Sequence, residues 1–195
     1  MILSKQHYKD YLEMDRIALG IPKGSFKFWL KDFIYPAYNL RFQKLLRKAE
    51  YIKNCKKNYG YRLYYYWLEY RFRKLSVKLG FSIPLNIFGP GLAIVHYGTI
   101  VINPNAKVGS NCRIHPSTCI GASGSSLKAP QIGDNVYIAP GVKIYGDIKL
   151  GNNIATAANA AVGKSFEEDN ILIGGVPAIK IKDIDITSII KHLKK

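Results

Sequence analysis

The sequence predicts a mainly-β protein whose central part is a parallel β-helix, preceded by a helical module and followed by a short helix. An aliphatic residue recurs every six positions between 102 and 162, with one interruption, and this period fits neither an α-helix nor an ordinary strand ladder. A small or aliphatic residue follows most of these positions by four, and Gly, Asn and Asp fill the gaps. The six-residue positions are Ile102, Val108, Ile114, Ile120, Ile132, Ile138, Ile144, Leu150, Thr156 and Val162.

Residues 1–80 are expected to form the helical module, because apolar residues recur there at helical spacing between Gly, Pro and Asn. Ser25 can cap one segment that Pro36 interrupts, and Gly80 can cap the C-terminus of the last segment. We expect helices over residues 10–18, 26–35, about 40–53 and 61–79, with Asn58-Tyr59-Gly60 as a stop signal.

Most of the positive charge lies in this module. Residues 1–80 carry 18 Lys and Arg against 6 Asp and Glu, so the rest of the chain contributes only +4 of the net charge of +16. In our preferred interpretation the aromatic side chains pack the helices together while the cations face solvent. The alternative is peripheral contact with an anionic membrane face, where Lys, Arg, Trp and Tyr are enriched. We expect no nucleic-acid partner, because no nucleic-acid-binding motif is present.

Composition favours a cytoplasmic protein, with association to a membrane face left open. No stretch approaches the ~20 uninterrupted apolar residues of a membrane span, and the first residues lack the apolar core of a signal peptide. The cysteines Cys55, Cys112 and Cys119 are odd in number and form no CxxC pair. We therefore expect them to be reduced and structural.

Each six-residue position is expected to bury its side chain inside the β-helix, with three positions to a coil. Residues 121–131 keep the count of six but lose the pattern, because Ser126 occupies the next position. We expect a loop there, and long loops on a rigid scaffold commonly carry function. The pattern ends after Val162, and residues 187–195 are expected to form a short basic helix.

Three segments of the chain carry a resemblance to a known family. They are Gly89-Pro90-Gly91-Leu92 followed by Ile94-Val95-His96-Tyr97-Gly98, the six-residue block, and the closing Gly174-Gly175-Val176-Pro177-Ala178. Together they resemble the hexapeptide-repeat acyltransferases, and most closely serine acetyltransferases and the enzymes that O-acetylate sugars in capsular or exopolysaccharide synthesis. The chain would then consist of a helical module over 1–80, a left-handed β-helix acyltransferase domain over 81–182 and a C-terminal helix over 183–195.

The resemblance implies a homotrimer that uses acetyl-CoA as co-substrate and no metal, with His96 as the catalytic base. The residue type suits the chemistry, because acetyl transfer from a thioester to a hydroxyl requires removal of the hydroxyl proton, and imidazole has an ordinary pKa of about 6.5. Counting back six from Ile102 gives His96 an inward position, so a packed structural histidine is the alternative. Tyr97 and His115 are expected substrate contacts, and His115 is otherwise a solvent-facing edge residue.

The resemblance also implies where acetyl-CoA binds, in the groove between neighbouring subunits. The family uses backbone atoms at turns that correspond here to Gly121-Ala122, Ala139-Pro140 and Ala157-Ala158. Pro140 has no N–H group, so one contact must differ. We expect the thioester end at Gly121-Ala122, because backbone N–H groups at a Gly-rich turn can hold the developing oxyanion. Candidate partners of the CoA phosphates, each of which is otherwise a solvated surface charge, are Lys164, Lys180 and Lys182.

Departures from the serine acetyltransferases bear on the acceptor. Val95 stands where they have a carboxylate before the catalytic histidine, and Ala129 precedes Pro130 where they have a second histidine. Their acidic residue in the lead-in strand corresponds to Ser82 or is missing. Loss of these groups weakens recognition of a zwitterionic amino acid. We therefore expect the acceptor to be a small or lipid-linked saccharide in polysaccharide biosynthesis.

Two alternatives to this function remain open. The first is serine O-acetylation, which uses the same donor and the same base. The second is a non-catalytic trimeric β-helix that serves as a scaffold or as an adaptor on a membrane surface.

Overall fold

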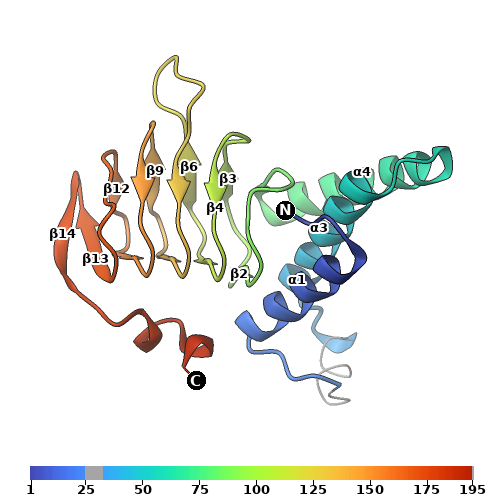
Figure 1. The fold of residues 1–195 in the computed structure, drawn as a ribbon, viewed down its shortest axis with the longest axis horizontal. Coiled ribbons are helices and arrows are strands. Elements are labelled where there is room, and N and C mark those ends of the chain that lie inside the picture. Colours follow the sequence, from blue (N-terminus) through green and yellow to red (C-terminus); the bar gives the residue numbers. More distant parts are fainter. Residues whose placement is uncertain (25–32, 195) are drawn as a thin grey trace.

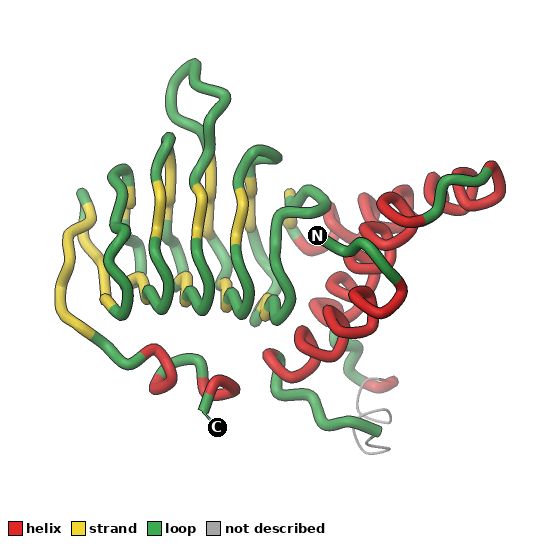
Figure 2. The backbone as a smooth tube through the Cα atoms, viewed as in Figure 1, coloured by secondary structure: helices red, strands yellow, loops and turns green. Residues whose placement is uncertain are grey.

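The computed structural model describes residues 1–24 and 33–194. A β-helix forms one half of the molecule, and the N-terminal helices pack against the end at which it begins (Figure 1). The strands are short pieces separated by turns, as Figure 2 shows. The last residues of the chain turn back along one side of the β-helix toward the helices (Figure 1).

The described helices of the N-terminal part are α1 (Lys5–Ala18), α3 (Tyr38–Cys55) and α4 (Tyr59–Leu79). Helix α1 begins before residue 10 because Ser4 caps it, accepting a hydrogen bond from the His7 N–H at 3.0 Å. The break predicted at residues 58–60 is present but falls at residues 56–58, because Asn58 accepts from the Tyr61 N–H at 3.0 Å and so caps the start of α4. Gly80, with a φ of 77°, ends α4 as predicted. The helix predicted over 26–35 lies mostly outside the described residues.

Strands from successive coils stack in register into three sheets, which form the faces of the β-helix. The first sheet contains β1 (Phe81–Ser82), β3 (Ile100–Ile102), β6 (Thr118–Gly121), β9 (Lys143–Tyr145) and β12 (Ala161–Val162). The second sheet contains β4 (Lys107–Val108), β7 (Gln131–Ile132) and β10 (Lys149–Leu150). The third sheet contains β2 (Ala93–Ile94), β5 (Arg113–Ile114), β8 (Tyr137–Ile138), β11 (Ala155–Thr156), β13 (Ile171–Gly175) and β14 (Ala178–Asp183).

The predicted interior is confirmed at every six-residue position. None of these side chains is more exposed than Ile132, which is 5% exposed. Parallel pairing stacks Ile102 on Ile120 and Ile120 on Ile144, so the interior is a ladder of aliphatic side chains. This close-packed ladder supplies the hydrophobic burial that holds the coils together.

Asparagines hold one row of turns in place. Asn111, Asn135 and Asn153 occupy the same turn of successive coils, each with a φ of 56–57°. The Asn111 amide donates to Asn135, and the Asn135 amide donates to Asn153, each at 2.8 Å. Asparagine is among the few residues that adopt left-handed backbone readily, and these side chains also satisfy one another.

A buried polar cluster attaches the helices to the first coil. Arg47, fully buried, pairs with Asp15 at 2.8 Å and Glu50 at 3.1 Å, and donates to the Phe88 and Gly89 carbonyls. Gln43 donates to the Leu92 carbonyl at 2.6 Å and accepts from the Ile94 N–H at 2.9 Å. Backbone groups at the open end of the β-helix are thereby satisfied by helical side chains.

The end of the chain differs from the predicted helix over 183–195. An antiparallel hairpin of β13 and β14 closes the β-helix, followed by the short 3-10 helices η1 (Ile186–Ser188) and η2 (Lys191–Leu193). Ile186 and Ile190 pack with Ala155 of the third sheet, so the segment follows the surface of the β-helix instead of forming a continuous helix. Within the described residues, no helix is both long and apolar enough to cross a membrane.

Candidate functional site

His96 lies on an enlarged corner between the third and first sheets. In the second coil the inward residues Ile114 and Ile120 are six apart, whereas in the first coil Ile94 and Ile102 are eight apart. Ile94, fully buried, fills the inward position, and the two additional residues project the turn outward, so His96 is exposed. The inward position inferred by counting back from Ile102 is therefore wrong, because the repeat gains two residues at this corner.

His115 occupies the equivalent corner one coil further on, but its side chain is buried. The residue is 9% exposed, and its ring centroid lies 4.9 Å from that of Tyr137. Burial lowers the pKa of His115 below its ordinary value, Arg113 acts in the same direction, and the hydrogen bond to the Ile138 carbonyl partly opposes them. Nδ1 lies 2.9 Å from the Ile138 carbonyl oxygen, which can only accept, so Nδ1 carries the proton and Nε2 is left as the acceptor.

Tyr97 points away from the interior and is 70% exposed. It lines a cavity of about 380 Å³ together with residues of the helical part, which we call the aromatic cavity. The aromatic cavity is lined by Ile34, Tyr35, Pro36, Tyr38, Lys78, Leu79 and Tyr97. The two predicted substrate contacts thus differ, since Tyr97 faces a cavity and His115 is largely enclosed.

Most of the residues predicted to bind acetyl-CoA lie along the two edges of the first sheet, whereas Lys180 and Lys182 lie on β14 of the third sheet. Gly121 is the last residue of β6, Ala122 follows it, and Lys164 follows β12, on one edge. The pairs Ala139-Pro140 and Ala157-Ala158 precede β9 and β12 on the other edge, in the same row of corners as His96. Within one copy of the chain, the sheet separates the predicted thioester site from the predicted base.

Two of the predicted backbone donors are already engaged. The Ala139 N–H donates to the Thr156 hydroxyl at 2.9 Å, and the Ala157 N–H donates to the Ile173 carbonyl at 2.8 Å. Pro140 has no N–H group at all. Ala139, Pro140 and Ala157 can therefore offer a ligand their carbonyl groups and side chains but no unpaired N–H.

The three predicted phosphate-binding lysines also differ in availability. Lys180 lies 2.5 Å from Glu168 and 2.8 Å from Asp183, and hydrogen bonds to these carboxylates raise its pKa. Lys164 lies over the ring of Phe166, 5.3 Å from the ring centroid, and Lys182 is exposed on β14. Lys180 is therefore charge-compensated, and Lys164 and Lys182 are better placed to meet a phosphate.

The predicted loop is present between β6 and β7 and projects from the β-helix (Figure 1). Asn105 donates to the Leu127 carbonyl at 2.7 Å, and Lys128 pairs with Asp147 at 2.7 Å, so the loop is tied to both adjacent coils. Ala129 returns to the interior and is 2% exposed.

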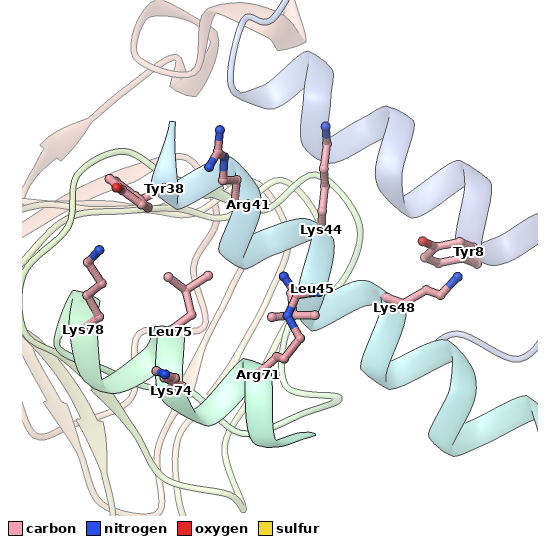
Figure 3. A pocket seen from close by; sticks show the side chains of 10 residues that line it. All are labelled: Tyr8, Tyr38, Arg41, Lys44, Leu45, Lys48, Arg71, Lys74, Leu75 and Lys78. Carbon is pink, nitrogen blue, oxygen red and sulfur yellow. The ribbon is translucent and has the colours of Figure 1, made fainter. Parts of the chain in front are cut away.

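A groove between α3 and α4 was not predicted from the sequence (Figure 3). We call it the basic groove. Its lining residues are Tyr8, Tyr38, Arg41, Lys44, Leu45, Lys48, Arg71, Lys74, Leu75 and Lys78, around a volume of about 560 Å³. The available signal was a duplicated pattern, Arg-Phe-x-Lys-Leu-x-x-Lys, at residues 41–48 and again at 71–78.

Comparison with known proteins defines the class. The family model for bacterial transferase hexapeptide (six repeats) matches residues 129–164. With the fold, this match confirms the predicted left-handed parallel β-helix and the resemblance to the hexapeptide-repeat acyltransferases.

The particular relatives are serine acetyltransferases. That of Staphylococcus aureus strain Mu50 is 34% identical over 88 residues, which are 44% of this chain and 41% of the relative. The chain thus matches less than half the length of this curated relative. The solved serine acetyltransferase of Neisseria gonorrhoeae aligns with a TM-score of 0.71 at 22% identity, over 98% of this chain and 73% of that one. The serine acetyltransferase of Brucella abortus strain S19, solved with coenzyme A, aligns with a TM-score of 0.69 at 23% identity, over 93% of this chain and 70% of that one. These structures share the fold.

Proposed function

We propose that the protein is an acetyl-CoA-dependent O-acetyltransferase with His96 as its general base. The observation that carries the proposal is an exposed histidine on the enlarged corner of a hexapeptide-repeat β-helix. Two further findings support it: the curated relative is named a serine acetyltransferase, and the Brucella abortus structure of that name contains coenzyme A.

The proposed reaction is a direct transfer. The acceptor oxygen attacks the thioester carbonyl carbon while His96 removes the hydroxyl proton, the C–S bond breaks, and the departing CoA thiolate receives that proton. Backbone N–H groups at Gly121-Ala122 would hold the oxyanion that forms on the carbonyl oxygen. His115, neutral and with Nε2 as its only acceptor, would contact an acceptor hydroxyl beside His96.

The site requires more than one copy of the chain in this proposal. His96 and Gly121 lie on opposite edges of the first sheet, so a neighbouring copy must bring its Gly121 edge against the His96 corner. A homotrimer arranges three such contacts around a closed three-fold axis. Acetyl-CoA would lie in each groove between copies.

Two versions of this activity differ in the acceptor, which is either serine or a saccharide. The names of the relatives favour serine over a saccharide. The residues on the two edges that would meet favour a saccharide, because half-buried Val95, before His96, and buried Ala129, in the loop after Gly121, provide no charge for an amino-acid zwitterion. Both versions use the same donor and the same base.

An acetyl-transfer assay tests the function and the acceptor together. Purified protein is incubated with acetyl-CoA and either serine or a panel of saccharides, and release of CoA thiol is followed. His96→Ala is expected to lower the rate at least about 100-fold, the lower bound for a lost general base. His7→Ala, which removes an exposed histidine of α1, is the matched control and should leave the rate unchanged. Wild-type rates from His96→Ala would overturn the assignment, and serine turnover would select the first version.

The proposed activity is cytoplasmic, with peripheral contact to a membrane through the helical part. Exposed Tyr66, Trp67 and Tyr70 on α4, next to Arg and Lys, support this contact. Co-sedimentation with vesicles that contain anionic lipid is the expected result, and recovery of all protein in the supernatant would contradict it.

A further inference from the structure

The duplicated pattern places two matching rows of cations opposite each other. In each segment the Arg, the two Lys and the Leu fall at positions i, i+3, i+4 and i+7, which share one face of a helix. The two Phe side chains are buried, and the rings of Phe42 and Phe72 stack with centroids 5.2 Å apart. This contact fixes the two helices side by side, with Leu45 and Leu75 between the cation rows (Figure 3).

The basic groove concentrates positive charge. Six of its ten lining residues are Lys or Arg, and no carboxylate is among them. In the part of the chain that the structure describes, no ion pair involves Lys44, Lys48, Lys74 or Lys78, whereas Arg73, outside the groove, pairs with Glu69 at 2.8 Å. Like charges at this density repel and destabilise the folded chain, so the arrangement suits an anion with more than one charge.

The basic groove adjoins the aromatic cavity, whose lining includes the residue that follows the proposed base. Both are lined by Tyr38 and Lys78, and the Lys78 ammonium lies 4.7 Å from the centre of the Tyr38 ring. At its other end the aromatic cavity reaches Tyr97, the residue after His96. Tyr35, Tyr38 and Tyr97 offer flat apolar faces with polar edges, which suit the C–H face and hydroxyls of a sugar ring.

From this adjacency we propose that the acceptor is a sugar that carries a phosphate or diphosphate. The sugar occupies the aromatic cavity with its reacting hydroxyl toward His96, and the phosphate is held in the basic groove by Lys44, Lys74, Lys78 and their neighbours. The proposal rests on the proposed acetyltransferase activity and names its substrate class. It gives the charge of the helical part a role in acceptor recognition.

Two other phosphate sources are less consistent with the geometry. The phosphates of acetyl-CoA are expected at Lys164, after β12, and at Lys180 and Lys182 on β14, and these strands lie at the end of the β-helix opposite the N-terminal helices (Figure 1). A flat membrane surface contacts cations best when they lie on a convex patch. The cations here instead surround a concave groove with Leu45 and Leu75 between them. Competition by CoA and binding to anionic vesicles distinguish these two sources from a phosphorylated acceptor.

Binding is tested first, without any acetyl transfer. Inorganic pyrophosphate is titrated into the full-length protein by calorimetry, and Lys44→Gln/Lys74→Gln is expected to weaken binding about tenfold or more. Lys5→Gln/Lys57→Gln removes two exposed lysines outside the groove and should bind as wild type. Equal losses in the two variants, or displacement of pyrophosphate by CoA, would overturn the assignment of the groove to the acceptor.

Activity is tested second, with matched acceptors. Acetyl-CoA is supplied together with one of four acceptors. They are a free hexose and the same hexose as its 1-phosphate, as a nucleoside diphosphate ester or as a short polyprenyl diphosphate ester. We expect at least one phosphorylated form to be acetylated with a kcat/KM at least about tenfold above that of the free sugar, and the preference to disappear in Lys44→Gln/Lys74→Gln. The nucleotide and polyprenyl forms distinguish the two natural carriers of the phosphate.

Failure of this proposal is distinguishable from failure of the proposed function. Acetylation of free sugar or of serine at the same rate in wild type and the groove variant would overturn the proposal while the transferase activity stands. Pyrophosphate binding that depends on the groove, with no thiol release from any acceptor, would remove the transferase and with it this acceptor. Groove-dependent binding to anionic vesicles, with no preference for phosphorylated sugars, would assign the groove to a membrane instead.

Discussion

His115 shows how burial keeps a titratable side chain neutral, although its hydrogen bond to the Ile138 carbonyl acts on the pKa in the opposite direction. The folded structure lowers its pKa, so at mildly acidic pH the unfolded chain takes up a proton that the folded chain does not. The stabilisation from neutral His115 is therefore complete above the ordinary pKa of about 6.5 and is lost progressively as the pH falls below it.

Replacement of His115 should make stability less dependent on pH. We expect the free energy of unfolding of the wild type to decrease from pH 7.5 to 5.5, and to decrease less in His115→Gln. Burial also lowers the pKa of His192, but His192 is present in both proteins, so the difference isolates His115. Urea unfolding at a series of pH values measures it, and identical pH profiles would contradict the burial of His115.

The sequence identified both His96 and His115 as candidate site residues, but it did not predict which of them is exposed. The six-residue count gave His96 an inward position and left His115 at an edge, and the structure reverses both. Two added residues in the first coil expose His96, and packing against Tyr137 helps to bury His115. A count along the chain cannot locate such an insertion, because either neighbouring turn could absorb it.

Among the elements, helix α3 connects the two halves of the molecule. One face carries Gln43, Arg47 and Glu50, which bond to the first coil, and the opposite face carries cations of the basic groove. Gln43 binds the Ile94 N–H, two residues before His96. Helix α3 therefore places the groove at a fixed distance from the proposed base.

Loss of Arg47 should strongly destabilise this connection. Arg47→Leu leaves Asp15 and Glu50 buried without their partner, and removal of one member of a buried pair costs about 3–5 kcal/mol. Arg73→Leu, which removes the largely exposed pair with Glu69, should cost less than about 1 kcal/mol. Chemical denaturation followed by circular dichroism compares them, and equal losses would show that the buried cluster does not hold the halves together.

For the whole molecule, the proposed site would combine His96 of one copy with Gly121 of another, so the proposal requires assembly. Gly121 and His96 lie on different edges of the first sheet, and no rearrangement within a rigid β-helix can bring them together. The projecting loop between β6 and β7 starts at the Gly121 edge, so it would reach toward a neighbouring copy. Assembly and activity are therefore expected to depend on the same surface.

Light scattering should report a trimer. With a chain mass of 22.0 kDa, the expected mass in solution is about 66 kDa. Replacement of exposed Val101 on the first sheet by Glu should reduce this mass and the acetyl-transfer rate together, because a charge would then face the neighbouring copy. An active monomer would show that the site is complete within one chain.

The sequence alone determined the coils of the β-helix, because each inward position is buried by its own neighbours and leaves a regular trace every six residues. The same local signals located the loop after β6 and the C-terminal cap of α4 at Gly80. Only the tertiary structure decided which histidine is exposed, which edge holds Gly121, and that residues 41–48 face residues 71–78 across a groove. These features depend on where distant segments meet, and a period records how each residue is buried but not which segments become neighbours.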